Sequence, residues 1–533
     1  MNPPLSDTSP GTSVPDTLPL LHPVRQKIKD GLVALSLANL CFIAAWQPVY
    51  KSAHLSYFEN EPITLPILIA VLINILWLAP VIWLTIRAWR HFSNRWFRAA
   101  CEWWFLLLCV PLLDFVRVRM FEITLFEIGA SLKRPLPVVG VLIFLAFIVW
   151  KRRWVVRYTA IAVGICSPLA LITLVRLALA GLSLTSPPPL LAFPPLPLHS
   201  VRPGQPRVVW IIFDEADHRV TFEQRPAGLK LPEFDRLRGG SIYATNAFPP
   251  GDDTIRSVPG LISGHWVSEA IPKGASELLL TLADTNTVVG WTELPSVFDS
   301  ARELGFNTAL VGWYHPYARV LGRSLNYCAS YPFPDPKYER PKTVGVALEL
   351  QLRPRRWLWH VTRIYIDTYR AMLADSLSVV TNASYGLVYL HLPPPHWPGI
   401  FVPATGGFSL AEQPMAPGYF NNLVLADHTL GKLRQALEAS GEWDKSWLIL
   451  SADHSWRASH TYDGQRDLRV PFLIKLPGAS TPATCSTPIN TSLTHDLILA
   501  ILRGELTNQT QTVAWLADRP STYRPLPAAD SRH

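Results

Sequence analysis

The chain has 533 residues, of which 49% are hydrophobic, and its 48 Lys and Arg against 40 Asp and Glu give a net charge of +8. The excess positive charge lies in the first 206 residues, which carry 18 basic and 9 acidic residues and leave 30 and 31 for the rest. Because these basic residues lie in short segments between long apolar stretches, they are typical of membrane topology signals and argue against a nucleic-acid partner.

Five apolar stretches in the N-terminal part each come close to the ~20 residues that an α-helix needs to cross a bilayer. They are Gly31–Tyr50, Ile63–Thr85, Ala99–Val116, Leu136–Trp150 and Tyr158–Leu184, of which the fourth is the shortest. Tryptophan, a residue enriched at membrane–water interfaces, lies at or near the ends of several of them (Trp46, Trp83, Trp150). The sequence therefore predicts an all-α membrane bundle of five transmembrane helices, with a buried helical bundle of a soluble protein as the alternative.

Basic residues concentrate on alternate sides of these stretches. Three precede the first stretch, four lie between the second and third, and four lie between the fourth and fifth (Arg25, Lys27, Lys29; Arg87, Arg90, Arg95, Arg98; Lys151, Arg152, Arg153, Arg157). The other two loops mix basic residues with glutamate. By the positive-inside rule, we expect a multi-pass protein of the bacterial inner (plasma) membrane, with a cytoplasmic N-terminus and a periplasmic or extracellular C-terminal domain.

Two segments lack the patterns of helix or strand. Residues 1–24 are rich in Pro, Ser and Thr, which predicts a disordered cytoplasmic tail before a transmembrane domain at 25–185. Residues 186–206 contain eight prolines and predict an extended, semi-rigid linker. The remaining residues, 207–533, form the expected catalytic domain.

This last part alternates short apolar runs with helical patterns. The predicted strands are Val208–Phe213, Thr308–Gly312, Leu387–His391, Trp447–Ser451 and Val470–Leu476, and the predicted helices include Ser257–Ser263, Leu294–Leu304, Tyr419–Ser440 and Thr494–Arg503. Such alternation is typical of an α/β domain with a mainly parallel sheet sandwiched by helices. Only Cys328 and Cys485 would face the outside, and whether they form a disulfide stays open.

Metal-binding side chains follow two of the predicted strands. Asp214 ends the first, and Asp453 and His454 follow Trp447–Ser451. The carboxyl ends of parallel strands meet at one edge of a sheet, and carboxylate and imidazole together suit zinc or manganese. Two alternatives remain at the first strand, because Asp214 also suits a turn cap and the neighbouring Glu215 also suits the ligand role.

Thr254 offers a hydroxyl group at the predicted start of a helix. Taken alone, such a threonine is more often an N-cap than a catalytic group. A helix N-terminus also stabilises a phosphate oxygen, and a metal can hold a threonine as an alkoxide. A hydroxyl together with metal ligands at strand ends indicates metal-assisted transfer at an ester of phosphorus or sulfur.

Five segments, in order, resemble the alkaline phosphatase/sulfatase superfamily. They are Val208–Asp214, Thr254–Gly264, the P-H-W-P stretch around His396, S-A-D-H at Ser451–His454, and R-V-P at Arg469–Pro471; Gly312–His315 is a looser match. The threonine and the apolar helices resemble the lipid A phosphoethanolamine transferases and the lipoteichoic acid synthases in particular. Sulfatases proper carry a cysteine or serine that becomes formylglycine, whereas this chain has Thr254.

The resemblance implies a membrane-anchored phosphotransferase with a divalent metal, zinc or manganese, held by Asp214, Thr254, Asp453 and His454. Thr254 would be the nucleophile, a membrane lipid the donor, and an envelope glycan or lipid the acceptor. His396, His315 and His460 would bind substrate oxygens or protonate the leaving group. The alternatives are a membrane-bound phosphodiesterase or sulfatase-like hydrolase, which the Asp at position 214 in place of the transferases' Glu favours, and a non-catalytic sulfatase-like envelope protein.

Overall fold

The computed structural model describes residues 21–46, 57–58, 65–120, 135–183, 193–332, 343–352, 356–411, 413–478 and 481–521. The predicted tail (1–24) lies almost wholly outside these residues, as does the first third of the predicted linker (186–192). The remainder of that linker, residues 193–206, contains no helix or strand. The chain divides into two compact units, a helical unit and an α/β unit.

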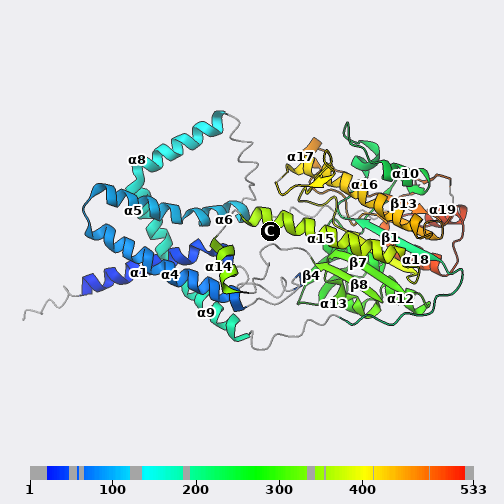
Figure 1. Cartoon of the computed structure of the whole chain (residues 1–533), viewed down its shortest axis with the longest axis horizontal. Coiled ribbons are helices and arrows are strands. Elements are labelled where there is room, and N and C mark those ends of the chain that lie inside the picture. Colours follow the sequence, from blue (N-terminus) through cyan, green and yellow to red (C-terminus); the bar gives the residue numbers. More distant parts are fainter. Residues whose placement is uncertain are drawn as a thin grey trace, which may run out of the picture. The chain divides into compact units, whose positions relative to one another are not determined.

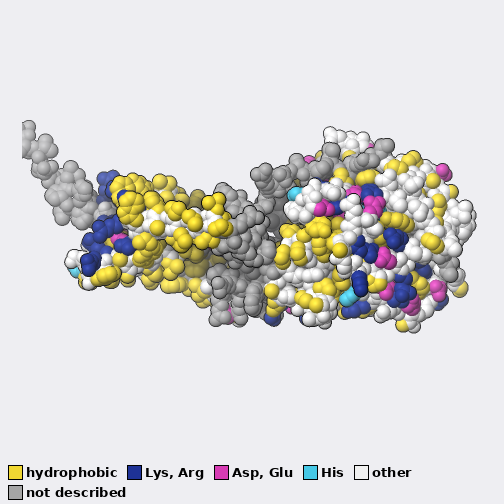
Figure 2. Space-filling model, turned by 90° about the horizontal axis from the view of Figure 1, so that it is seen from above, with side chains coloured by type: hydrophobic (Ala, Val, Ile, Leu, Met, Phe, Trp, Pro, Cys, Tyr) yellow, Lys and Arg dark blue, Asp and Glu magenta, His cyan; other side chains and the backbone are white. Residues whose placement is uncertain are grey.

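The helical unit contains the apolar segments of the N-terminal part. Its helices are α1 (Leu21–Cys41), α2 (Ile43–Trp46), α4 (Leu65–His91), α5 (Arg95–Leu108), α6 (Val110–Met120), α8 (Pro135–Ile165), α9 (Ser167–Ser183) and α14 (Val344–Leu352). Three stretches within the described residues are long and apolar enough to cross a membrane: Leu65–His91, Arg95–Arg117 and Pro135–Ile165. Figure 2 shows hydrophobic side chains over most of this unit's visible surface, with Lys and Arg gathered at one end.

The predicted boundary between the fourth and fifth apolar stretches coincides with a kink. α8 joins two helices across Lys151 (φ −101°, ψ 19°), directly after the fourth stretch ends at Trp150, and the basic residues that follow are helical instead of forming a loop. Lys and Arg are good helix formers. A further break lies at Cys166, just before Ser167 and Pro168 begin α9. The count of five transmembrane helices stays a prediction, because three stretches of the described residues are long and apolar enough to cross a membrane.

The α/β unit is built on an eight-stranded sheet of order β14-β2-β13-β12-β1-β9-β7-β8. Its strands are β1 (Arg207–Phe213), β2 (Ile242–Ala244), β7 (Thr308–Tyr314), β8 (Tyr327–Pro332), β9 (Leu387–Leu392), β12 (Ser446–Ser451), β13 (Phe472–Lys475) and β14 (Ala483–Cys485). The pairs from β12 through β1, β9 and β7 to β8 are parallel, and β13 is antiparallel to both of its neighbours. The five strands predicted from the sequence are confirmed, and the sheet is mainly parallel as expected.

Helices cover both faces of this sheet (Figure 1). Alternate residues of β1 point to opposite faces. Val208, Trp210 and Ile212 pack against α11 (Thr254–Ser263), α12 (Val297–Glu303) and α18 (Thr494–Leu502). Val209, Ile211 and Phe213 pack against α10 (Pro232–Gly239), α15 (Arg356–Thr381) and α16 (Met415–Ala439). Burial on both faces explains why the parallel strands are continuous apolar runs rather than alternating ones.

Two segments belong to a different unit from the residues that flank them in the sequence. Residues 51–62, between α2 and α4, belong to the α/β unit, and residues 341–352, which include α14, belong to the helical unit. In the helical unit, the Asn74 amide on α4 donates a 2.7 Å hydrogen bond to Gln351 on α14. Ion pairs also tie this unit together, with Arg90 2.8 Å from Asp30 and Arg152 2.6 Å from Glu102.

Candidate active site

The candidate site residues lie at the ends of four adjacent parallel strands, at one edge of the sheet. Asp453 and His454 follow β12, Asp214 follows β1, His391 lies near the end of β9, and His315 follows β7. Because parallel strands end at the same edge, residues hundreds of positions apart meet there. All of these side chains are fully buried.

Asp214, Asp453 and His454 form a compact cluster. One ligand atom from each lies within 4.8 Å of the others. His454 Nε2 is 3.5 Å from Asp453 Oδ2 and 3.7 Å from Asp214 Oδ1. Asp453 Oδ1 accepts hydrogen bonds from the backbone N–H groups of Glu215 (3.1 Å) and His454 (2.8 Å), which fixes the direction of its other oxygen.

Thr254 is brought to this cluster by α11. Its Oγ1 lies 3.3 Å from Asp214 Oδ2 and 3.2 Å from His454 Nε2. The N-cap of α11 is Asp253, whose side chain accepts from the Arg256 N–H, so the capping role proposed as the alternative for Thr254 belongs to its neighbour. The Thr254 hydroxyl is therefore free for the cluster.

The arrangement of hydrogens in the cluster follows from the backbone. His454 Nδ1 lies 3.0 Å from the Ser455 carbonyl oxygen and donates to it, because a carbonyl only accepts. Nε2 of the neutral ring then carries a lone pair directed at Thr254. Ser257 on α11 also donates to the Asp453 carbonyl, which fixes the helix against the loop that follows β12.

The donor set fits a divalent cation. Among the described residues, Asp214 Oδ1, Asp453 Oδ2 and His391 Nε2 are buried and have no hydrogen-bond partner. Burial and the charges of Asp453 and Glu215 raise the pKa of Asp214 well above its ordinary value. Unpaired buried carboxylate oxygens are costly unless a cation compensates them, and carboxylates with one imidazole suit zinc or manganese.

Glu215, the alternative ligand, is directed elsewhere. Its Oε1 lies 3.2 Å from Nε of Arg457, a side chain that is 46% exposed. Burial acts to raise the pKa of Glu215, but the neighbouring His396 imidazole and Arg457 guanidinium outweigh it and hold that pKa below the usual value. Glu215 therefore stays ionised and places Arg457 beside the cluster.

The three histidines expected to contact substrate lie in different surroundings. His396 is half-buried, and its Nδ1 donates to the Trp397 carbonyl, which leaves Nε2 as an acceptor. His315 is not directed at the cluster, because both of its ring nitrogens are hydrogen-bonded, one of them to the Thr254 carbonyl at 3.1 Å. His460 is exposed at the start of α17 (His460–Asp463), where its Nδ1 faces the Arg457 carbonyl.

The sequence interpretation missed His391. Its Nε2 lies 3.8 Å from Asp214 Oδ2 and 3.9 Å from Asp453 Oδ2, and its Nδ1 lies 2.7 Å from the Tyr317 hydroxyl. Within the predicted strand Leu387–His391 it is the only ionisable side chain other than a tyrosine, in a strand buried on both faces. A buried histidine next to the P-H-W-P stretch was the available signal.

A comparison with protein families identifies the family of the chain. The family model described as Sulfatase matches residues 206–503, more than half of the chain, and the chain belongs to this family of enzymes. This match confirms the resemblance to the alkaline phosphatase/sulfatase superfamily seen in the sequence. A comparison with curated protein sequences gives no match.

Several solved structures are similar to the chain at low identity. A crystal structure of Ps i-CgsB is 16% identical, with 58% of this chain and 74% of that chain covered and a TM-score of 0.42. The phosphonate monoester hydrolase of Agrobacterium radiobacter is 13% identical, with 60% and 79% covered and a TM-score of 0.38. Murine ectonucleotide pyrophosphatase/phosphodiesterase 5 is 13% identical, with 58% and 100% covered and a TM-score of 0.37.

Proposed function

We propose that the protein is a membrane-anchored, metal-dependent phosphotransferase. It moves a phospholipid-derived head group, phosphoethanolamine- or phosphoglycerol-like, through a phosphodiester on Thr254 to a hydroxyl of an envelope glycan or lipid. The helical unit spans the bacterial inner membrane with five segments, and the α/β unit lies on the periplasmic or extracellular side. The partners are lipid and glycan, with no nucleic acid.

One observation carries the proposal: the buried Thr254 hydroxyl lies within hydrogen-bond distance of both Asp214 and His454. Both neighbours accept, so the hydroxyl hydrogen is directed into the cluster and its loss leaves a nucleophilic oxygen. Asp214, Asp453, His454 and Thr254 would hold the cation, zinc or manganese. When bound, such a cation supplies positive charge that stabilises an alkoxide and polarises a phosphoryl oxygen.

The first half-reaction exchanges one ester bond for another. Thr254 Oγ1 attacks phosphorus, the new O–P bond forms, and the bond from phosphorus to the diacylglycerol oxygen breaks. Thr254 loses one proton in this step and the leaving diacylglycerol oxygen takes up one, so the half-reaction is balanced. Arg457, paired with Glu215 beside the cluster, offers a positive charge to the phosphodiester.

The second half-reaction needs a base for the incoming hydroxyl. Burial lowers the pKa of His396 below its ordinary value, and the Trp397 carbonyl holds the hydrogen on Nδ1. Neutral His396 therefore presents a lone pair at Nε2, which suits removal of the acceptor's proton better than protonation of a leaving group. The acceptor oxygen then bonds to phosphorus as the bond from phosphorus to Thr254 Oγ1 breaks, and Oγ1 takes up a proton to restore the hydroxyl. Water in place of the acceptor gives hydrolysis, the second candidate function, which the Asp at position 214 favours.

The test is native mass spectrometry of the full-length protein purified from membranes in mild detergent. We expect bound zinc or manganese and a covalent adduct on Thr254 whose mass identifies the transferred group. Thr254→Ala abolishes the adduct, whereas Thr512→Ala, which removes a buried hydroxyl on α19 (Gln509–Ala517), leaves it intact. A full adduct on the Thr254→Ala protein would overturn the assignment of the nucleophile.

Product analysis separates the two candidate functions. Incubation with phospholipid alone and with phospholipid plus a glycan acceptor gives diacylglycerol in both cases for a hydrolase, and rapid diacylglycerol release only with acceptor for a transferase. A reporter fused after His533 tests the side of the membrane. Activity of that reporter only in the cytoplasm would contradict the proposed localisation.

A further inference from the structure

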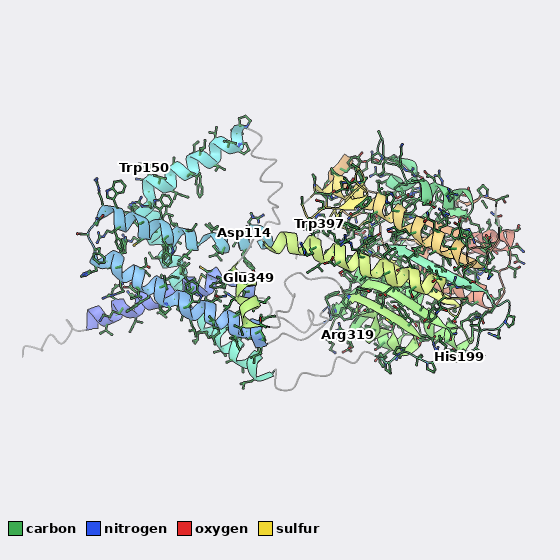
Figure 3. The ribbon with its side chains drawn as sticks, viewed as in Figure 1. Asp114, Trp150, His199, Arg319, Glu349 and Trp397 are labelled. Atoms are coloured by element: carbon green, nitrogen blue, oxygen red, sulfur yellow. The ribbon has the colours of Figure 1, made fainter. Side chains whose placement is uncertain are left out.

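Tyr57, which lies far from residues 207–533 in the sequence, is buried in the α/β unit. Tyr57 lies in the segment between α2 and α4, 258 residues before His315, yet it belongs to the α/β unit and its side chain is 0% exposed. The Tyr57 carbonyl accepts a 2.6 Å hydrogen bond from Nη2 of Arg319, which is labelled in Figure 3 and lies on α13 (Tyr317–Val320). The adjacent Phe58 packs edge-to-face on Tyr314.

The Tyr57 hydroxyl ends a short chain of hydrogen bonds that leads to the nucleophile. It lies 3.0 Å from His315 Nδ1, and His315 Nε2 lies 3.1 Å from the Thr254 carbonyl oxygen. A carbonyl only accepts, so Nε2 of His315 carries the hydrogen. Nδ1 of the neutral ring is then an acceptor, and the Tyr57 hydroxyl donates to it.

The surroundings hold His315 in this single orientation. The ring is fully buried and packs edge-to-face against Trp291, at 5.0 Å between ring centroids, and against Tyr57 at 5.9 Å. Its backbone carbonyl accepts from the Ser330 hydroxyl at 3.2 Å. Neither ring nitrogen is left for a substrate, so the ring's contact with the site is through the backbone of Thr254 alone.

We propose that Tyr57 is a positioning residue for the nucleophile and acts through His315. The inference rests on the proposed role of Thr254. By orienting the His315 ring, the Tyr57 hydroxyl fixes the carbonyl of Thr254 at the first turn of α11, and with it the position of the backbone that carries the Oγ1 side chain. The segment between the first two apolar helices is thus part of the catalytic apparatus and not a passive connection.

The predicted effect is on turnover and not on substrate binding. In Tyr57→Phe the ring and its packing remain and only the hydroxyl is lost. Small misplacement of a reacting oxygen lowers the rate of the chemical step, so we expect kcat to fall about tenfold with KM changed less than about twofold. Tyr369→Phe is the matched control, since it removes an equally buried hydroxyl that bonds Thr429 at 2.8 Å, away from the site.

The experiment uses the full-length zinc-loaded protein in detergent, with bis(4-nitrophenyl) phosphate as the phosphodiester probe. In a His315→Gln background, Tyr57→Phe should change kcat less than about twofold, because its effect passes through His315. Additive losses in the double variant, a KM effect without a kcat effect, or wild-type kcat in Tyr57→Phe would each overturn the inference.

A second measurement tests the role of Tyr57 without depending on catalytic activity. Hydrogen exchange of residues 251–263 should be faster in Tyr57→Phe than in the wild type and unchanged in Tyr369→Phe. If the wild type does not turn over the probe, the proposed function fails while this measurement still decides the role of Tyr57. Unchanged exchange in Tyr57→Phe would refute the positioning role whatever the activity.

Discussion

The paired carboxylates of the candidate site give a prediction in which the sign of a stability change depends on metal. In Asp453→Asn, the amide oxygen can retain both backbone hydrogen bonds of Oδ1, while the amide nitrogen replaces the unpaired Oδ2. The change therefore removes a negative charge and a metal ligand with little loss of packing. We expect the metal-free variant to be more stable than the metal-free wild type, and the order to reverse when metal is added.

The magnitude follows from the spacing of the charges. Two unit charges 4.8 Å apart, the upper limit of the cluster, repel by about 3.5 kcal/mol at an effective dielectric constant of ~20. The raised pKa of Asp214 means that partial protonation already relieves some of this repulsion. We therefore expect a gain of about 2 kcal/mol in the metal-free state. An α/β unit of about 330 residues has an unfolding entropy of about 0.7 kcal/mol per kelvin, so Tm rises by about 3 °C.

Adding metal reverses the order of the two Tm values, so that the wild type becomes more stable than Asp453→Asn. Zinc at about one hundred times its Kd stabilises the wild type by about 2.7 kcal/mol, or about 4 °C, and does not stabilise Asp453→Asn. The assay is Tm of the full-length protein in detergent, after chelation and during titration with zinc or manganese. Asp427→Asn is the matched control, because Oδ1 of Asp427 also accepts two backbone N–H groups and its Oδ2 is also unpaired.

Two results would refute this reasoning. A metal-free Asp453→Asn protein less stable than the metal-free wild type would show that the two carboxylates do not repel as described. A full metal response in Asp453→Asn, or its loss in Asp427→Asn, would show that the cation does not bind at the cluster.

Three further predictions concern the residues around the site and the core. Burial raises the pKa of Asp427 to about 6, above its unfolded value, so its charge lowers stability increasingly as pH rises from about 4 to 6. Asp427→Asn should therefore gain about 3 kcal/mol at pH 7 and nothing near pH 4, and an equal gain at both pH values in thermal unfolding would contradict this. His391→Gln should weaken zinc binding about 10–100-fold in the same Tm titration, because its Nε2 faces both carboxylates, and unchanged affinity would exclude His391 from the site. Gly312→Ala should cost about 1–3 kcal/mol, since a Cβ there would collide with the Tyr317 ring; wild-type stability would show that Tyr317 moves freely.

The fold of the α/β unit was predictable because its signals are local. A strand buried on both faces is a continuous apolar run, and the runs ending at Phe213, His391 and Ser451 contain little else. The helix expected at Ser257–Ser263 is present, although it begins earlier, at Thr254, where Asp253 supplies the cap. The kink of α8 at Lys151 falls at the predicted end of the fourth apolar stretch, whereas the basic residues after it are helical and do not form the expected loop.

The site was predictable where a residue stands at the end of a strand and not where its role depends on distant contacts. Asp214, Asp453, His454 and Thr254 do meet in the structure. His391 was missed because a histidine inside an apolar strand has no local mark of its partners. Tyr57 was missed because no property of its own segment indicates that it is buried beside His315. The sequence also placed His315 by its position after a strand, whereas its two hydrogen bonds decide what it contacts.

The crossing of segments between the two units limits how this protein can be divided. The chain passes from one unit to the other at residues 50–51, 62–63, 186–187, 340–341 and 352–353. A fragment that begins in the proline-rich linker therefore lacks Tyr57 and carries α14 without the Asn74 partner of Gln351. A protease cut in that linker would not yield two complete modules. A chimaera that joins this α/β part to the helices of another protein would lack both the buried Tyr57 and the hydrogen bond from Asn74 to Gln351. Each half of the protein depends on a piece of chain that the other half carries.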